Sequence, residues 1–214
     1  MIVIDIGNTN IVIGVYSQKK LTFKIRLKTH EKKLLQKLNQ YFKLKKINNL
    51  NLDYKNCIIS SVSSFSTNEV IKFFKRLKFK VLNINIKNIP KKIKFKYALN
   101  QLGADRIANT YAAINKYKNN ILVVDFGTAT TFDIIIGNIY EGGLITSGIN
   151  ISHNALVYYA SKLKKISIIK TNKLIGKNTK DSMQSGFYWG YISLINGIID
   201  KIIKEKKIRP KIIL

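Results

Sequence analysis

The sequence is poor in the residues that build disulfides and metal sites. Cys57 is the only cysteine among 214 residues, and His30 and His153 are the only histidines. A single thiol excludes a disulfide framework and a cysteine-based metal site, and two histidines make a histidine-based site unexpected. Because Cys57 begins the run Cys57–Ile59, we expect it to be a small buried residue. We expect His153 at the surface or in a helix cap.

Acidic residues are scarce as well. The chain has 11 Asp and Glu against 38 Lys and Arg, which gives a formal net charge of +27. Such a charge raises nucleic acid or an anionic surface as a partner. However, the excess is mostly lysine and is spread along the chain, together with abundant Ile and Asn, which share AT-rich codons with Lys. With no nucleic-acid-reading motif, we favour solvated lysine faces over a specific nucleic-acid surface.

Long apolar runs are also missing. No stretch of about twenty apolar residues occurs, so we expect no membrane-spanning helix. The first residues, Met1–Asp5, place an acid where a signal peptide would have a basic region followed by an apolar one. We therefore expect a cytoplasmic protein. Its length and its 46% of hydrophobic residues are enough for two small domains with real cores.

The chain is organised around Leu122–Ile136, LVVDFGTATTFDIII. Two short runs rich in Val and Ile, typical of buried strands, flank the hinge Asp125–Thr131. The hinge contains Gly127, which permits unusual backbone angles, and three threonine hydroxyls. Such a turn can bind a phosphate through N–H groups and hydroxyls while the carboxylate of Asp125 holds a cation. An ordinary hairpin is the alternative interpretation.

A second copy of this pattern lies 120 residues earlier, in Ile2–Tyr16, IVIDIGNTNIVIGVY. Asp5 aligns with Asp125, Gly7 with Gly127 and Asn8 with Thr128, and we expect the offset to be constant. The repeat predicts two similar domains, each opening with a hairpin whose turn faces the cleft between them. Two such turns predict a nucleotide site.

Periodicity along the rest of the chain predicts an α/β architecture. Expected strands are Leu21–Leu27, Asn56–Val62, Val81–Ile86 and the segment from Ile208. Expected helices are Glu31–Lys46, Asn68–Leu77, a helix opened by Gly103–Arg106, Ser152–Leu163 and Lys180–Lys206. A polar joint at residues 116–120 suggests the domain boundary.

Several local features accompany these elements. We expect Ser66 or Thr67 to cap the helix Asn68–Leu77, and Ala155, Leu156, Tyr159 and Ala160 to face inward. The glycines of 141–148 predict a tight turn with close backbone approach. Gly186, Gly190 and Gly197 would permit close approach of another helix, in the same chain or in a second subunit.

The ordered motifs resemble those of the type III pantothenate kinases, members of the actin-like, sugar-kinase-like ATPase superfamily. Asp5–Thr9 resembles the first phosphate motif and Asp125–Thr131 the second. Gly103–Arg106, followed by Asn109, resembles the pantothenate-site signature, which separates this family from acetate kinases, sugar kinases and chaperone ATPases. Gly142–Gly143 and Gly176–Thr179 also fall where the family has them, so the similarity runs over essentially the whole chain.

The resemblance implies a fold of two similar actin-like (ribonuclease H-like) domains, with mixed sheets flanked by helices and a cleft between them. The N-terminal domain, residues 1–116, would carry the first phosphate motif. The C-terminal domain, residues 117–214, would carry the second motif. The family continues beyond the position of Leu214 into a Thr-Gly-Gly turn near the nucleotide, so this domain is expected to be truncated at its end. If this chain is the full polypeptide, the resemblance implies that part of the adenosine side of the site is missing, which would impair ATP affinity, stability or activity.

The implied reaction is the ATP-dependent phosphorylation of pantothenate to 4'-phosphopantothenate, the first step of coenzyme A synthesis. Asp105 would accept the proton of the attacking alcohol, and Arg106 would stabilise anionic substrate or developing phosphoryl charge. By resemblance, Asp125 would bind a monovalent cation, K+ or ammonium, and Asp5 would organise Mg-ATP.

The resemblance also assigns binding residues. The ATP-binding set is Asp5, Ile6, Gly7, Asn8, Thr9, Asn10, Ile11, Val12 and Thr128. The pantothenate-binding set is Tyr97, Gly103, Ala104, Asp105, Arg106 and Thr179. A homodimer with the pantothenate pocket near the subunit interface is implied, which would suit the glycine-bearing last helix.

Two further departures from the family pattern stand out. Ser147 replaces a proline, and the segment between Tyr97 and Gly103 is one residue short and lacks another proline. The early C-terminus and the high basic charge keep two alternatives beside the active kinase. One is a catalytically weak or inactive descendant acting as a nucleotide-binding or regulatory protein. The other is a nucleic-acid-binding protein that uses its basic surface.

Overall fold

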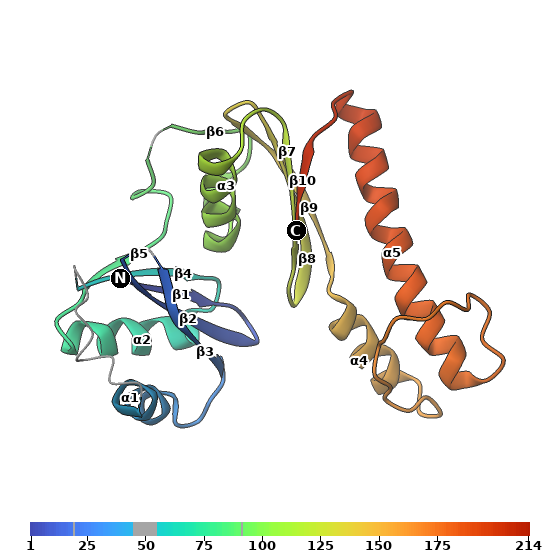
Figure 1. The fold of residues 1–214 in the computed structure, drawn as a ribbon, viewed down its shortest axis with the longest axis horizontal. Coiled ribbons are helices and arrows are strands. Elements are labelled where there is room, and N and C mark those ends of the chain that lie inside the picture. Colours follow the sequence, from blue (N-terminus) through green and yellow to red (C-terminus); the bar gives the residue numbers. More distant parts are fainter. Residues whose placement is uncertain (19, 45–54, 91) are drawn as a thin grey trace. The chain divides into compact units, whose positions relative to one another are not determined.

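The computed structural model describes residues 1–18, 20–44, 55–90 and 92–214 (Figure 1). The chain divides into two compact units, Met1–Asn115 and Lys116–Leu214. The last two residues of the expected helix Glu31–Lys46 lie outside the described residues. Within the described ranges, no helix is both long enough and apolar enough to cross a membrane.

The first unit is an α/β layer structure. Its strands are β1 (Ile2–Ile6), β2 (Asn10–Ser17), β3 (Lys20–Lys28), β4 (Asn56–Ser61), β5 (Lys80–Asn83) and β6 (Lys94–Phe95). Its helices are α1 (Leu34–Leu44), α2 (Ser64–Arg76), the short 3-10 helix η2 (Leu99–Gln101) and α3 (Ala104–Lys116). The sheet runs in the order β3-β2-β1-β4-β5. β1 to β3 form an antiparallel meander, whereas β4 lies parallel to β1 and β5 parallel to β4.

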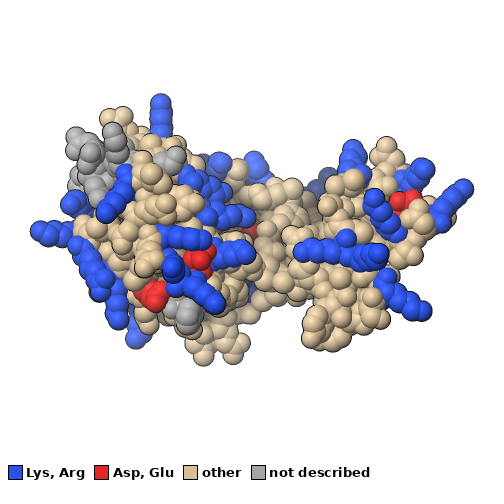
Figure 2. All heavy atoms as spheres, turned by 90° about the horizontal axis from the view of Figure 1, so that it is seen from below, with Lys and Arg blue, Asp and Glu red and all other residues tan. Residues whose placement is uncertain are grey.

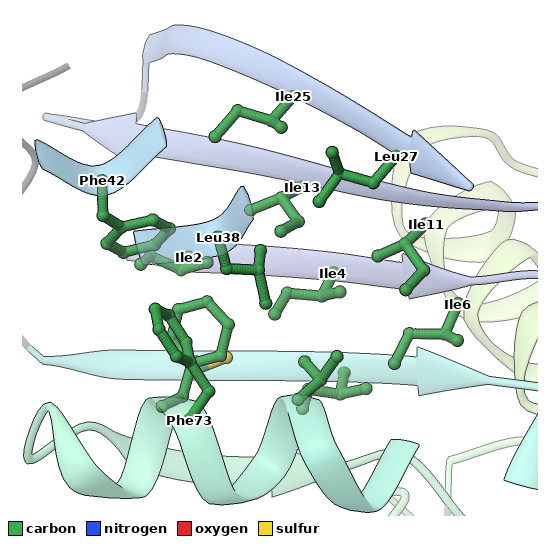
Figure 3. Close-up of a cluster of buried hydrophobic side chains, with 14 of the residues drawn as sticks. Ile2, Ile4, Ile6, Ile11, Ile13, Ile25, Leu27, Leu38, Phe42 and Phe73 are labelled. Atoms are coloured by element: carbon green, nitrogen blue, oxygen red, sulfur yellow. The ribbon is translucent and has the colours of Figure 1, made fainter. Parts of the chain in front are cut away.

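One face of this sheet carries the core of the unit (Figure 3). Strand residues alternate between the two faces, so Ile2, Ile4 and Ile6 of β1 all point to the same side. The antiparallel register places Ile13 beside Ile4 on that side, and Ile25 beside Ile13. α1 and α2 cover this apolar face through Leu38, Phe42, Phe73 and their neighbours. The hydrophobic alternation in the sequence thus determines which face receives the helices.

The second unit repeats the meander. Its strands are β7 (Ile121–Phe126), β8 (Ala129–Ile136), β9 (Ile139–Ser147) and β10 (Lys211–Ile213), and its helices are α4 (Ile149–Tyr159) and α5 (Thr179–Lys206). These strands follow one another as β10-β7-β8-β9, with β7 to β9 antiparallel and β10 parallel to β7. This is the order β4-β1-β2-β3 of the first unit. The predicted α/β fold with repeated mixed sheets flanked by helices is confirmed.

α5 packs along one face of the second sheet. Leu122, Val124 and Phe132 of the sheet meet Ile195 and Ile202 of the helix in a single buried cluster. The helix has 28 residues, and only Met183, Ser185, Ile195 and Ile202 are buried among them. Many of the remaining residues of α5 are exposed in the described part of the chain, among them Gly186, Gly190 and Leu194.

The expected constant offset between the two hairpins is wrong after the turn. Asp5 pairs with Val12 across the first hairpin, whereas Asp125 pairs with Thr131 across the second. The second turn is thus one residue shorter, and Ile13 of β2 corresponds to Phe132 of β8. The core requires this shift, because it keeps the inward positions of both strands apolar.

Several local expectations also need correction. α2 begins at Ser64 with Ser63 at its N-cap position, so Ser66 and Thr67 lie inside the helix. The glycine-bearing segment 141–148 is not a turn, because most of it forms strand β9. β5 is shorter than the expected strand Val81–Ile86.

The inward face of α4 differs from the expectation too. Leu156 and Tyr159 are exposed, whereas His153, expected at the surface, is buried. Its ring packs edge-on against Phe187, with 5.0 Å between ring centroids, and its Nε2 accepts a hydrogen bond from the N–H of Ile166 at 3.4 Å. His153 therefore links α4 to α5 and to the irregular segment between them, and it is a packed core residue.

Cys57 behaves as expected. The side chain is fully buried in β4 within the first core. Burial raises the pKa of the Cys57 thiol from 9.0 to about 12, because the apolar surroundings penalise the thiolate. The thiol is therefore protonated and unreactive in the folded protein.

Candidate functional site

The first candidate phosphate turn joins β1 to β2. Asp5 is exposed near the end of β1, and the side chains of Asn8 and Thr9 are exposed in the turn itself. The N–H of Gly7 closes the turn by donating to the carbonyl oxygen of Asn10 at 2.9 Å. The turn thus offers a carboxylate, an amide and a hydroxyl to solvent.

Three further residues of the predicted ATP-binding set differ in which of their groups are accessible to a nucleotide. Ile6 and Ile11 are fully buried in the core of the unit, so only their backbone groups are available to a nucleotide. Val12 pairs with Asp5 across the hairpin and is half-buried on the opposite face of the sheet.

Thr29 holds the β1–β2 turn through two hydrogen bonds, a role that was not predicted from the sequence. The hydroxyl of Thr29 donates to the carbonyl oxygen of Gly7 at 2.6 Å, and its N–H donates to the carbonyl oxygen of Thr9 at 3.0 Å. Ser66 of α2 in turn donates its hydroxyl to the carbonyl oxygen of Thr29 at 2.6 Å. No local sequence signal marks a threonine just after a strand for this role.

The Gly103–Arg106 motif forms the start of α3, as predicted. Asp105 lies in the first turn of the helix, half-buried, and its Oδ1 accepts a hydrogen bond from the N–H of Arg106 at 2.8 Å. Gly103 provides the space for this arrangement, because a Cβ built there would lie 2.4 Å from Oδ1 of Asp105. The position of the Asp105 carboxylate at the start of α3 therefore depends on residue 103 having no side chain.

Arg106 and Tyr97 lie together. The guanidinium carbon of Arg106 is 5.6 Å from the centroid of the Tyr97 ring, within the range of a cation–π contact. Arg106 is only 4% exposed, so its charge is largely removed from bulk water. A buried cation of this kind interacts strongly with any anion that reaches it.

Val62 connects the two motifs of the first unit. Its N–H donates to the carbonyl oxygen of Ile6 at 3.0 Å, at the end of β1. A Cβ at Gly103 would lie 3.3 Å from Cγ1 of the same valine. The first phosphate turn and the start of α3 are therefore held against a single residue of the loop between β4 and α2.

The second candidate phosphate turn joins β7 to β8. Asp125 is half-buried at the end of β7, and Thr128 is exposed in the turn. The N–H of Gly127 donates to the carbonyl oxygen of Ala129 at 2.9 Å. The hydroxyl of Thr130 in β8 forms a hydrogen bond with the hydroxyl of Tyr191 in α5. The ring centroids of Tyr191 and Phe126 are 6.3 Å apart.

Thr179 is the first residue of α5 and is exposed. Asn178 caps the helix: its Oδ1 accepts from the N–H of Asp181 at 2.9 Å, and its Nδ2 donates to Oδ2 of Asp181 at 2.8 Å. Gly176 is required by close packing, because a Cβ there would lie 2.3 Å from the backbone nitrogen of Ser182. The Gly176–Thr179 motif therefore positions Thr179 at a helix N-terminus.

Residues 1–18, 20–44, 55–90 and 92–214 contain no group of three or more His, Cys, Asp or Glu that could hold a metal ion. A nucleotide-bound Mg2+ is usually held by one or two carboxylates together with phosphate oxygens and water. The exposed carboxylate of Asp5, beside the first turn, fits that requirement.

Comparison with known proteins agrees with these motifs. The sequence profile of type III pantothenate kinases matches residues 1–201. The type III pantothenate kinase of Pelagibacter ubique is 40% identical over 218 residues, covering 100% of this chain and 86% of the relative. That of Halalkalibacterium halodurans is 37% identical over 221 residues, covering 100% and 85%.

A solved structure of a Baf family protein from Campylobacter jejuni has the same fold, with a TM-score of 0.56 and 21% sequence identity. The match covers 99% of this chain and 81% of the Campylobacter jejuni chain. The matched profile and the full-length relatives lead to one assignment: this chain belongs to the type III pantothenate kinase family.

Proposed function

We propose that this protein is an ATP-dependent kinase that phosphorylates pantothenate to 4'-phosphopantothenate, the first step of coenzyme A biosynthesis. Family membership supports the substrate pair. The structural observation that carries the proposal is the contact of Val62 with both motifs of the first unit. That contact holds a candidate general base close to a turn suited to phosphate.

In the proposed reaction, Asp105 accepts the proton of the pantothenate hydroxyl as its oxygen attacks the γ-phosphorus of ATP. The new oxygen–phosphorus bond forms while the bond from the γ-phosphorus to the bridging oxygen breaks, and ADP leaves with that oxygen. The hydrogen bond from the N–H of Arg106 to Oδ1 fixes the carboxylate of Asp105 in direction. A positioned carboxylate of this kind typically contributes about 10²–10⁴-fold to a rate by general base catalysis.

Arg106 is proposed to stabilise negative charge, on the substrate carboxylate or on the transferring phosphoryl group. Its burial removes the competing water that would screen the interaction. The ring of Tyr97 supports the guanidinium from one side and would line the same pocket. Gly103, Ala104 and Thr179 complete the proposed pantothenate contacts.

The two turns are proposed to contact ATP through N–H groups and hydroxyls, with Gly7, Asn8 and Thr9 in the first turn and Thr128 in the second. Asp5 would hold Mg2+, which when bound neutralises charge on the β- and γ-phosphates. Asp125 would hold K+ or ammonium. On the face drawn in Figure 2, lysine and arginine side chains are scattered among uncharged residues, a surface that attracts anions such as ATP.

We further propose a cytoplasmic homodimer that uses α4, α5 and the segment between them. Tyr158, Tyr159 and Ile175 are 80%, 85% and 81% exposed, an unusual density of uncovered large apolar side chains. Gly186 and Gly190 lie one helical turn apart on α5, and a Cβ at either position would meet nothing within 4 Å. No described helix of the second unit approaches these two glycines closely, and we propose a second subunit as the occupant of this face.

The variant Asp105→Asn tests the catalytic proposal. Asparagine keeps the Oδ1 that accepts from the N–H of Arg106, so the start of α3 is preserved while the base is lost. We expect pantothenate phosphorylation to fall by about 10²-fold or more, with Asp200→Asn, an exposed acid of α5, as the matched control. Turnover in Asp105→Asn equal to that of the control would overturn the assignment of Asp105.

The alternative of a catalytically weak descendant gains no support from these observations. The residues proposed for proton transfer and charge stabilisation, Asp105 and Arg106, are both present and organised. A folded protein that binds ATP but does not phosphorylate pantothenate would be the result that favours it.

A further inference from the structure

We propose that Thr29 is a positioning residue for ATP, because it sets the direction in which the first phosphate turn presents its N–H groups. The inference rests on the proposed function, since it assumes that the Gly7–Thr9 turn contacts phosphate. It adds to the ATP-binding set a residue that touches no ligand itself.

Thr29 is buried and held by hydrogen bonds to three other residues. The residue directly follows β3, is 1% exposed and makes three hydrogen bonds through three different groups. Its hydroxyl donates to the carbonyl of Gly7, its N–H donates to the carbonyl of Thr9, and its carbonyl accepts from Ser66. Both ends of the three-residue turn are thus attached to one buried side chain and its backbone.

The planarity of the peptide bond turns this attachment into a directional constraint. In a trans peptide unit, the C=O and the N–H of the next residue point in opposite directions. Because the carbonyl of Gly7 points inward to the hydroxyl of Thr29, the N–H of Asn8 must point away from it. Hydrogen bonding of one carbonyl therefore aims one donor outward, toward the position where a phosphate would lie.

Ser66 extends the constraint to α2. Its side chain is fully buried, and the 2.6 Å hydrogen bond to the carbonyl of Thr29 spans 37 residues of sequence. Preorganised donors cost no reorganisation when the ligand binds, which is why rigid supports matter at phosphate sites. Ser66 thus anchors Thr29, and through it the turn, to a helix packed on the core of the unit.

The test compares Thr29→Val, which keeps the side-chain shape but removes the hydroxyl, with Thr29→Ser, which keeps the hydroxyl. We expect Thr29→Val to weaken ATP binding by about fivefold, since one directed hydrogen bond is worth about 1 kcal/mol. The KM for pantothenate should stay within about twofold, and Thr29→Ser should restore ATP binding. Thr110→Val, a buried threonine that donates to a helix carbonyl, is the matched control.

Two measurements separate the possible outcomes. ATP binding is measured by calorimetry without pantothenate, so the result does not depend on turnover. The amides of Gly7 and Thr29 donate hydrogen bonds within and beside the turn, so their hydrogen exchange should accelerate in Thr29→Val and Ser66→Ala but not in Thr110→Val. The inference is wrong if folded Thr29→Val keeps both its ATP affinity and its exchange rates. It is also wrong if this variant loses ATP binding and pantothenate binding to the same extent.

The same design separates the inference from the proposed function. If the unmodified protein binds ATP but does not phosphorylate pantothenate, the kinase proposal fails while the Thr29 comparison is still decided by affinity. If Thr29→Val does not fold, Ser66→Ala decides the question, because normal exchange of the Gly7 and Thr29 amides in that variant would contradict the anchoring role.

Discussion

The N–H of Gly148 donates a hydrogen bond to the carbonyl oxygen of Thr128, with 2.9 Å between nitrogen and oxygen. A Cβ at Gly148 would lie 2.3 Å from the carbonyl oxygen of Gly127 and 2.6 Å from that of Thr128. Gly148 stands between β9 and the start of α4, so the second phosphate turn lies directly against a helix N-terminus. The absence of a side chain at residue 148 is what permits this contact.

Gly148→Ala should therefore displace the second turn. The backbone φ of Gly148 is −67°, which alanine adopts readily, so the effect comes from the collision and not from backbone strain. We expect a rise in the KM for ATP and a loss of about 1–3 kcal/mol in the free energy of unfolding, typical of overpacking. Steady-state kinetics and thermal unfolding measure both. Ser147→Ala is the control, and an equal KM for ATP in the two variants would refute this role of Gly148.

Gly103→Ala should impair catalysis without unfolding the protein. The added methyl group would collide with Oδ1 of Asp105, and the flexible carboxylate can rotate away. A misplacement of about 1 Å can cost about 10²-fold in rate, so we expect kcat to fall more than the KM for ATP changes. Kinetics beside a thermal unfolding curve check this, and unchanged kcat would show that the position of Asp105 does not limit turnover.

Cys57 should make stability depend on alkaline pH. Burial raises the pKa of its thiol to about 12, whereas the unfolded chain releases the proton near 9.0. Between these values the folded state binds more protons than the unfolded state, so the free energy of unfolding falls as pH rises, by up to about 1.4 kcal/mol per pH unit.

The measurement compares urea unfolding of the natural protein and Cys57→Ala from pH 8 to pH 10. The stability of the natural protein should fall relative to that of the variant, which lacks the thiol. A second readout is a thiol reagent at pH 8, which should react only after unfolding. Rapid reaction of the folded protein would contradict the burial of Cys57.

Gly190→Leu should dissociate the proposed dimer. Leucine stabilises a helix by about 1 kcal/mol relative to glycine, so a loss of association cannot arise from a weakened α5. Light scattering after size-exclusion chromatography should give a dimer for the natural protein and a monomer for the variant. Gly190→Ala, which adds a single methyl group, is the graded control. A dimeric Gly190→Leu protein would place the interface elsewhere.

Much of this fold could be predicted because its signals are local. Glycine and an acid at the end of an apolar run indicate each hairpin turn, and the alternation of isoleucines in β1 indicates the buried face. The helix start at Asp105 is predicted by the apolar-periodic segment that follows it, whereas its role as a base is implied only by the family resemblance. The catalytic and binding roles of these residues stay predictions until they are measured.

The features that were missed depend on contacts distant in sequence. Thr29 acts through Gly7 and Ser66, which local patterns cannot associate with it. His153 is buried because Phe187 and the segment near Ile166 fold over it. The shorter second turn was hidden as well, because the threonines after Gly127 fit either register and only the core packing of Phe132 decides between them.

The measurement that tests the central claim most directly is a coupled assay of ADP release, with and without pantothenate, in K+ and in Na+. We predict ADP release that requires pantothenate and that is faster in K+, accompanied by formation of phosphopantothenate. A folded protein that releases no ADP in response to pantothenate in either salt would contradict the proposed kinase activity.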